Sequence, residues 1–252
     1  MPELLSFLHQ LSAAAREVTS GAVAPAAHNK AGEGGYDPVT EIDRAAERAL
    51  RAVIATAFPD DGIEGEEYGV ERPEAQRRWL LDPVDGTRAL ICGLPSWTTL
   101  VALVKEGEPV AGFVDAPGLD ELMIGLPGAT TLNGRPARVS GCASLGEARL
   151  SSTDPYLFAG AEAEAFERVR RAAMLTRFGY DALAYARLAA GSLDLVVESG
   201  LKRHDWAALV PVVRGAGGVI GDWRGGEDFE SGAIVAAATP ALYDEVVRLL
   251  SQ

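Results

Sequence analysis

The first part of the chain places apolar residues at helical spacing. This pattern predicts amphipathic helices over residues 3–20 and 40–54, the second ending in the segment 58–62. Between them, residues 28–37 are glycine-rich and polar and are predicted to form a mobile loop. Thr40 is followed three positions later by Asp43, which is a capping-box variant and predicts the start of the second helix at this point.

The middle of the chain changes to short apolar runs that are typical of strands. Residues 79–81 form one such run, and residues 98–105 and 110–115 form two more, joined by a turn-like segment that predicts an antiparallel hairpin. Residues 116–146 contain short apolar pieces among glycines and prolines, and the pair Asn133-Gly134 is a strong turn signal. We therefore expect further sheet edge and turns here.

From residue 148 onwards, predicted strands and helices alternate. Such alternation, with helices of about ten residues, indicates a layered α/β lobe. We place a lobe boundary near residues 135–147, with one cleft shared by the two lobes. The predicted strands are 148–152, 174–178, 193–198, 219–221 and 233–237, and the predicted helices are 161–173, 181–190, 205–216 and 240–250.

Composition and charge narrow the function classes. The 252 residues are 48% hydrophobic and 23% charged, as in ordinary globular proteins. A net charge of −13 argues against a nucleic-acid-binding surface and would repel a phosphorylated substrate unless metal ions reverse the field at the site. The two cysteines form no CxxC pair, and neither a membrane span nor a signal peptide is evident, so we expect a protein of the reducing cytoplasm without membrane contact.

The run 79–81 leads directly into a short polar turn. Asp82 and Asp85 stand three residues apart, with Pro83 and Gly86 beside them and Thr87 at the end. Because Pro83 has no N–H, we expect it to end the strand, and Gly86 permits a tight turn. Two carboxylates in one turn suit a small divalent cation, although an acidic turn without a ligand is the alternative.

Three other segments carry oxygen ligands that could join this turn. Glu66 and Glu67 lie in an acidic segment between glycines, Asp43 lies in the capping box, and Asp205 precedes a helical pattern that it could also simply N-cap. If the segments converge, they could hold Mg²⁺, which shares its coordination shell with water and phosphate. Two such ions would stabilise both the attacking and the leaving oxygen of a phosphoryl transfer.

These motifs resemble those of the inositol monophosphatase-like, magnesium-dependent and lithium-sensitive phosphatases. The resemblance rests on motifs that span nearly the whole chain and implies one family domain with an α-β-α-β-α layered sandwich. Residues 1–138 would form a metal-binding lobe with an antiparallel-rich sheet, and residues 139–252 a substrate lobe of alternating strands and helices. The matching segments are 37–43, 65–67, 82–87, 205–208 and 216–218.

The resemblance also implies roles for individual residues. Glu66, Asp82 and the Val84 carbonyl would bind a first magnesium, Asp82, Asp85 and Asp205 a second, and a third, weaker ion would lie near Glu66. Thr87, paired with Asp43, would orient and deprotonate the attacking water beside Glu66. Backbone N–H groups of Gly86 and Thr87 would hold a phosphate oxygen. Family members are often dimers, so we expect a homodimer, to which the apolar run 98–114 could contribute a face.

Substrate specificity is expected to come from the second lobe. Asp181 and Glu198 resemble positions of the histidinol-phosphate phosphatase branch, and two carboxylates would suit a substrate with an ammonium and an imidazole. Asp181 could instead cap the following helix. His204 stands where the family usually has an aromatic residue. We interpret it as a surface side chain, and the alternative is a residue beside the substrate or the metal.

The predicted function is therefore magnesium-dependent hydrolysis of a small phosphate ester. L-Histidinol phosphate, a metabolite of histidine biosynthesis, is the first candidate substrate. The alternatives are an inositol-1-phosphate or broad sugar-phosphate phosphatase and, in a different class, a non-catalytic binding partner in RNA processing.

Overall fold

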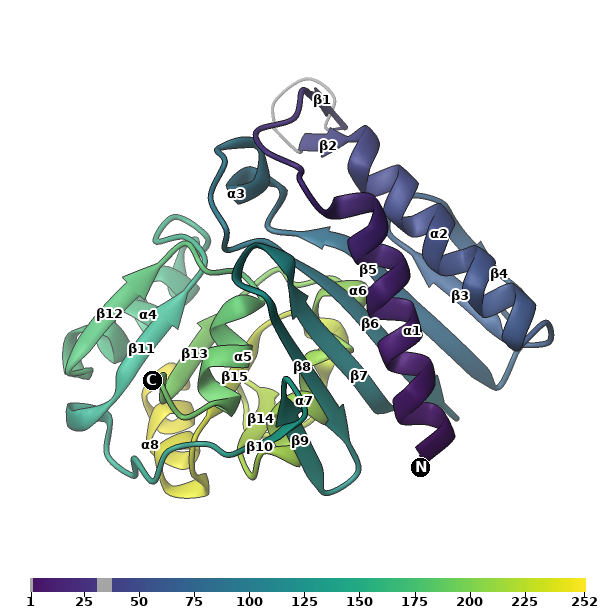
Figure 1. The fold of residues 1–252 in the computed structure, drawn as a ribbon. Helices are drawn as coiled ribbons and strands as arrows, with labels where there is room; N and C mark the ends of the chain where they lie inside the picture. The colour runs from purple at the N-terminus through teal and green to yellow at the C-terminus, as the bar shows by residue number, and fades with distance from the viewer. Residues whose placement is uncertain (1, 31–37) are drawn as a thin grey trace.

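Two helices pack side by side over one face of a large sheet (Figure 1). The computed structural model describes residues 2–30 and 38–252, and in it α1 (Pro2–Thr19) and α2 (Glu41–Ala57) bury Leu8 and Leu50 against Trp79 of the sheet. The capping box at Thr40 and Asp43 is present, as predicted. Of the predicted loop 28–37, residues 28 and 29 instead lie in β1 (Ala27–Asn29), which pairs with β2 (Pro38–Thr40), and residues 31–37 lie outside the described part.

The large sheet has eight strands in the order β10-β9-β8-β7-β6-β5-β3-β4. All its neighbouring strands are antiparallel except β3 and β5, so the prediction of an antiparallel-rich sheet is confirmed. The predicted hairpin joins β6 and β7, with Lys105 opposite Glu108. The strands are β3 (Gly62–Gly65), β4 (Gly69–Glu71), β5 (Arg77–Asp85), β6 (Thr98–Lys105), β7 (Glu108–Ala116), β8 (Glu121–Leu126), β9 (Ala129–Leu132) and β10 (Arg135–Ala137), with α3 (Thr87–Ile91) after β5 and the 3-10 helix η1 (Pro117–Leu119) after β7.

The second sheet has five strands in the order β12-β11-β13-β15-β14. Its helices alternate with its strands along most of the chain, as predicted. The strands are β11 (Arg149–Ser152), β12 (Leu175–Phe178), β13 (Leu195–Glu198), β14 (Val219–Asp222) and β15 (Ile234–Ala237). The helices are α4 (Ala161–Ala172), α5 (Leu183–Ala189), α6 (Arg203–Trp206), α7 (Leu209–Gly215) and α8 (Pro240–Leu250), with the 3-10 helices η2 (Leu145–Glu147) and η3 (Phe229–Ser231).

Helices α5 and α7 lie between the two sheets and α4 and α8 pack together on the outer face of the smaller one (Figure 1). One hydrophobic cluster contains residues of both sheets together with α5 and α7, such as Leu100, Leu188 and Val196. Helix α7 approaches β8 so closely that a Cβ on Gly125 would lie 2.4 Å from the Val212 nitrogen, so only glycine fits there. The layers follow the predicted α-β-α-β-α order, and this fold class is confirmed.

Three predicted boundaries are wrong for identifiable reasons. Strand β5 does not stop at Pro83 but continues to Asp85, because its pairing with β6 shifts between Asp82 and Asp85 and this bulge accommodates the proline. The predicted helix 205–216 is two helices, since Pro211 has no N–H to donate to the carbonyl four residues earlier. The predicted helix 181–190 begins only at Leu183, because Asp181 is in the left-handed region with φ 46°.

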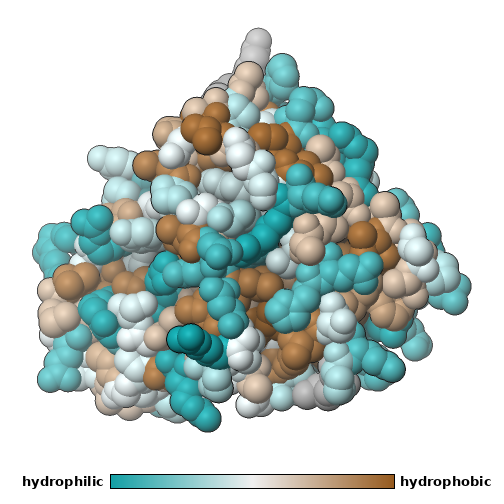
Figure 2. All heavy atoms as spheres, in the orientation of Figure 1, coloured by the Kyte–Doolittle hydropathy of each residue, from teal (hydrophilic) through white to brown (hydrophobic). Residues whose placement is uncertain are grey.

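The apolar run 98–114 is interior rather than a subunit face. From Thr98 to Val104 every residue of β6 is buried, and Val101 and Phe113 pack in the same cluster as α1 and α2. The homodimer therefore remains a prediction without an assigned surface. On the face shown in Figure 2, hydrophobic and hydrophilic residues are interspersed. Among the described residues, no helix combines the length and the hydrophobicity that a membrane span requires.

Candidate functional site

Strand β5 delivers two carboxylates to the end of the large sheet. The Asp82 side chain is buried, and its Oδ1 accepts the Val84 N–H at 3.1 Å. The Asp85 Oδ2 accepts the Ala182 N–H at 2.7 Å and the Thr98 hydroxyl at 3.3 Å. Gly86 then turns the chain with φ 78°, a conformation that is strained for residues with a Cβ. The bulge and the turn thus hold both aspartates at one edge.

A third carboxylate arrives from the other side of the cleft. Asp205 is the third residue of α6 and not its N-cap, and its Oδ2 accepts the backbone N–H of Lys202 at 2.7 Å. Its Oδ1 lies 3.3 Å from His204 Nε2. The His204 side chain is only 14% exposed, so its interpretation as a surface histidine is wrong.

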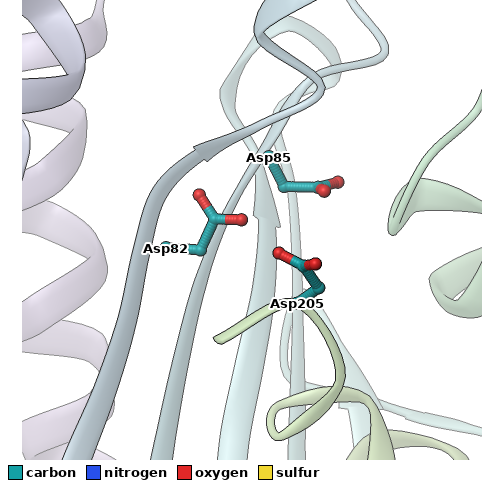
Figure 3. Close-up of side chains that lie close together, drawn as sticks. All are labelled: Asp82, Asp85 and Asp205. Carbon is teal, nitrogen blue, oxygen red and sulfur yellow. The ribbon is translucent and has the colours of Figure 1, made fainter. Parts of the chain in front are cut away.

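Asp82, Asp85 and Asp205 point toward one shared space, with one oxygen of each within 4.8 Å of the others (Figure 3). Burial raises the pKa of both Asp82 and Asp85; the charge of Glu66 adds most to the effect on Asp82, and that of Asp181 to the effect on Asp85. Burial also raises the pKa of Asp205, against the lowering effect of His204. Like-charged oxygens held together in this way fit a hard divalent cation, which would offset their repulsion.

Glu66 lines the cavity that also contains Asp82, Asp85 and Asp205, but it is not part of their close group. Its carboxylate lies 2.8 Å from Lys30 Nζ, which also contacts Glu67 at 2.6 Å. The fully buried Glu47 of α2 holds this segment in place by accepting the backbone N–H groups of Glu67 at 2.7 Å and Tyr68 at 3.2 Å. Helix α2 therefore fixes where Glu66 stands relative to β5.

Thr87 and Asp43 lie in contact behind the aspartates. The Thr87 hydroxyl is 3.3 Å from Asp43 Oδ1 and 3.0 Å from the Val84 carbonyl oxygen. Asp43 Oδ2 accepts the N–H of Thr40 at 3.0 Å and also bonds the Thr40 hydroxyl. Burial raises the pKa of Asp43, which makes it a stronger base than an exposed aspartate. A hydroxyl has one proton to donate, so Thr87 has a choice between two acceptors.

Two adjoining cavities meet at these side chains. The first, of about 240 Å³, is lined by Glu66, Asp82, Val84, Gly86 and Thr87 together with the cationic side chains of Arg88 and Lys202 and the imidazole of His204. The second, of about 190 Å³, contains Tyr185, Glu198 and apolar residues. Asp85, Thr153, Asp181 and Asp205 line both. Carboxylates therefore line both cavities, whereas the cationic side chains of Arg88 and Lys202 line only the first.

Both predicted specificity residues lie in this region. Burial raises the pKa of Asp181 to about 6, against the lowering effect of Arg88. Asp181 does not cap α5, whose N-cap is Ala182 without a side-chain hydrogen bond. Glu198, at the end of β13, is 1% exposed, and its Oε1 accepts the Thr153 N–H at 2.7 Å and the Thr153 hydroxyl at 3.0 Å. Burial nevertheless raises the pKa of Glu198 to about 8.

The raised pKa of Glu198 predicts a pH effect on the stability of the metal-free protein. The folded-state pKa of about 8 exceeds the ordinary value of 4.5, so between these two pH values folding is accompanied by proton uptake. The free energy of unfolding therefore falls as pH rises from about 4.5 to about 8. In Glu198→Gln the side chain cannot ionise, so its melting temperature relative to wild type should increase from pH 5 to pH 9. Thermal unfolding with a chelator present measures this, with exposed Glu108→Gln as control. Parallel profiles for wild type and Glu198→Gln would contradict the assignment.

Sequence reasoning missed Glu47, Thr153 and Tyr185. For Glu47 a signal existed, because it stands within the apolar stripe of α2 and four residues before Arg51, with which it forms a buried ion pair at 2.7 Å. Thr153 and Tyr185 carry no local signal, since Thr153 is identified by its hydrogen bonds to Glu198 and Tyr185 by lining the second cavity.

Comparisons with known proteins agree with this geometry. The model of the inositol monophosphatase family matches residues 1–252. The "Bifunctional phosphatase IMPL2, chloroplastic" of Arabidopsis thaliana is 44% identical over 75% of this chain, and the match spans only 55% of that relative's length. A "Histidinol-phosphatase" of Chlorobaculum parvum is 34% identical over 81% of this chain and 80% of its own.

A solved inositol monophosphatase structure from Zymomonas mobilis has a TM-score of 0.89 and 36% identity, covering 100% of this chain and 98% of that one. Sequence family and fold therefore agree along the whole chain, including the segments that carry the clustered carboxylates. The chain belongs to the inositol monophosphatase family, a family of metal-dependent phosphatases, and is a phosphoric monoester hydrolase.

Proposed function

We propose that this chain hydrolyses L-histidinol phosphate to L-histidinol. The observation that carries the proposal is the distribution of charged side chains over the two cavities: Arg88 and Lys202 line only the first, Glu198 lines only the second, and Asp181 lines both. A substrate with an anionic phosphate and a cationic remainder fits this distribution, with the phosphate in the first cavity and the remainder near Asp181 and Glu198. The similarity to a relative named histidinol-phosphatase supports the same choice.

We propose Mg²⁺ as the metal, with two ions and a third, weaker one near Glu66. Glu66, Asp82 and the Val84 carbonyl would bind the first, and Asp82, Asp85 and Asp205 the second. When bound, such ions supply charge stabilisation at the phosphate and lower the pKa of a coordinated water. The donors available here, carboxylate and carbonyl oxygens, are those that magnesium prefers.

The chain's own residues would then position the reactants. We assign Thr87 to orienting the attacking water and Asp43, through the 3.3 Å contact, to accepting its proton. Backbone N–H groups of Gly86 and Thr87, at the turn into α3, would hold a phosphate oxygen. No covalent enzyme intermediate is needed, because water itself is the nucleophile.

Asp181 tests the substrate assignment directly. Asp181→Asn should lower kcat/KM for L-histidinol phosphate by about tenfold to hundredfold, since a charge-assisted hydrogen bond to the substrate ammonium is lost. Asparagine tolerates the positive φ of this position, so the backbone should be retained. Phosphate release from a panel of esters measures the effect.

Asp120→Asn is the matched control, because Asp120, in the turn before β8, also has a positive φ of 52° and lines neither cavity. It should leave turnover unchanged. For myo-inositol 1-phosphate, which has no cationic group, Asp181→Asn should change kcat/KM by about twofold at most. Equal losses on both esters would remove the specificity role.

Inositol-1-phosphate hydrolysis is the second candidate function. The similarity to an inositol monophosphatase over the full chain favours it, and carboxylates also accept hydroxyl donors. At matched concentration, wild-type enzyme should release phosphate faster from L-histidinol phosphate than from myo-inositol 1-phosphate. The reverse order would exchange the two proposals.

A further inference from the structure

Two residues that line the second cavity each carry a buried polar side-chain atom without a hydrogen-bond partner among the described residues. The atoms are the Tyr185 hydroxyl oxygen and Glu198 Oε2, and both side chains are 1% exposed. Buried polar atoms in native proteins nearly always have a partner, so each such atom calls for an explanation. Here both residues line one cavity of about 190 Å³.

Neighbouring contacts fix these atoms in place. Glu198 Oε1 is engaged by the N–H and hydroxyl of Thr153, which leaves Oε2 as the free oxygen of the carboxyl group. The Tyr185 ring is held in the core between the two sheets. Burial and the negative charge of Glu198 raise the pKa of the Tyr185 hydroxyl, so it keeps its proton and can both donate and accept.

The cavity is too large to be explained by a single bridging water. One water needs only about 10–15 Å³ of such space, whereas about 190 Å³ is available. The cavity also adjoins the cluster of Asp82, Asp85 and Asp205, since Asp85 and Asp205 line both cavities. A group attached to a phosphate at the cluster would therefore reach into this space.

We propose that Tyr185 is a specificity-determining residue, which together with the free oxygen of Glu198 binds the polar end of the leaving alcohol. The proposal rests on the function proposed above and extends it to a residue without an assigned role. A neutral imidazole fits the pair in both protonation states of Glu198. Above the Glu198 pKa of about 8, the ring N–H would donate to Oε2 and the other ring nitrogen would accept the Tyr185 O–H; below it, the carboxyl O–H would donate to the ring and the ring N–H would donate to the Tyr185 oxygen. Asp181, which lines both cavities, would then face the ammonium group.

Tyr185→Phe removes only the hydroxyl and keeps the ring that fills the core. The matched control is Tyr243→Phe, which also removes a buried hydroxyl, one that donates to the Asp222 carbonyl oxygen in the outer layer. Calorimetric titration of the full-length protein, with magnesium and inorganic phosphate present, measures binding of L-histidinol and of myo-inositol. Tyr185→Phe should weaken L-histidinol binding by about tenfold to hundredfold, and Tyr243→Phe should leave it unchanged.

Kinetics separate this role from a merely structural one. For L-histidinol phosphate, Tyr185→Phe should lower kcat/KM by a similar factor, mainly through KM. For ethyl phosphate, whose leaving group has no polar end, kcat/KM should stay within about twofold. Equal losses on both esters, or no loss on either, overturn the proposal.

The outcomes also distinguish this proposal from the proposed substrate. If wild type binds myo-inositol more tightly than L-histidinol, the substrate assignment fails. In that case, a loss of myo-inositol binding in Tyr185→Phe still supports Tyr185 as the residue that binds the alcohol. If Tyr185→Phe weakens neither alcohol, or wild type binds neither, the role of Tyr185 is overturned whatever the substrate.

Discussion

Asp82→Asn is expected to lower metal-dependent phosphate release by at least about 10³-fold while leaving the metal-free protein at least as stable as wild type. Burial raises the pKa of Asp82, and the negative charges of Glu66, Asp85, Asp205 and Asp43 raise it further. Removing its charge therefore relieves repulsion in the apo state. An asparagine oxygen can still accept the Val84 N–H, so the turn is retained.

Two measurements separate these effects. Thermal unfolding with a chelator should give a melting temperature for Asp82→Asn equal to or above that of wild type, and added Mg²⁺ should stabilise wild type but not the variant. Exposed Asp60→Asn serves as control for both. Near-normal activity in Asp82→Asn, or an unchanged stabilisation by Mg²⁺, would remove the metal role from this residue.

Thr87→Ala is expected to lower kcat by about 10²-fold or more with little change in KM, because the hydroxyl acts on the attacking water and not on the substrate alcohol. The geometry behind this expectation is the contact of the Thr87 hydroxyl with Asp43 Oδ1 at 3.3 Å and with the Val84 carbonyl at 3.0 Å. Single-substrate kinetics at saturating Mg²⁺ measure the effect.

Thr87→Ser keeps the hydroxyl and should recover most of the lost rate. Thr99→Val is the matched control, since the buried Thr99 hydroxyl also donates to a carbonyl of the same turn, that of Pro83 at 2.8 Å, without lining either cavity. If Thr87→Ser is as slow as Thr87→Ala, or Thr99→Val is equally impaired, the loss reflects the shape of the turn and not the hydroxyl.

Local patterns predicted most of the architecture because each relevant signal lay within a few residues. The capping box at Thr40 and the antiparallel hairpin of 98–105 with the following run both appear as predicted, although β7 begins at Glu108, two residues earlier than expected. The wrong boundaries lie at residues whose backbone conformation depends on tertiary contacts and not on the local sequence. Pro83 stays within β5 because a bulge accommodates it, and Asp181 adopts a positive φ before α5 instead of starting the helix.

The site was predictable in part for a similar reason. The motif around Asp82 and Asp85 is local, whereas its approach to Asp205 depends on α6 crossing the end of β5. Tyr185 gave no signal, because a tyrosine on an apolar helix face is normally interpreted as a core residue. Only the structure shows that its hydroxyl has no partner among the described residues. The burial of His204 likewise follows from its neighbours in the cavity and not from its own segment.

The most direct test of the central claim is an anomalous diffraction map from a crystal soaked with Mn²⁺, which can replace Mg²⁺ at oxygen sites. We expect an anomalous peak between the carboxylates of Asp82, Asp85 and Asp205, and we expect this peak to be lost in a crystal of Asp82→Asn. An enzyme whose phosphate release requires divalent metal but whose map places the ion away from these three side chains would contradict the claim.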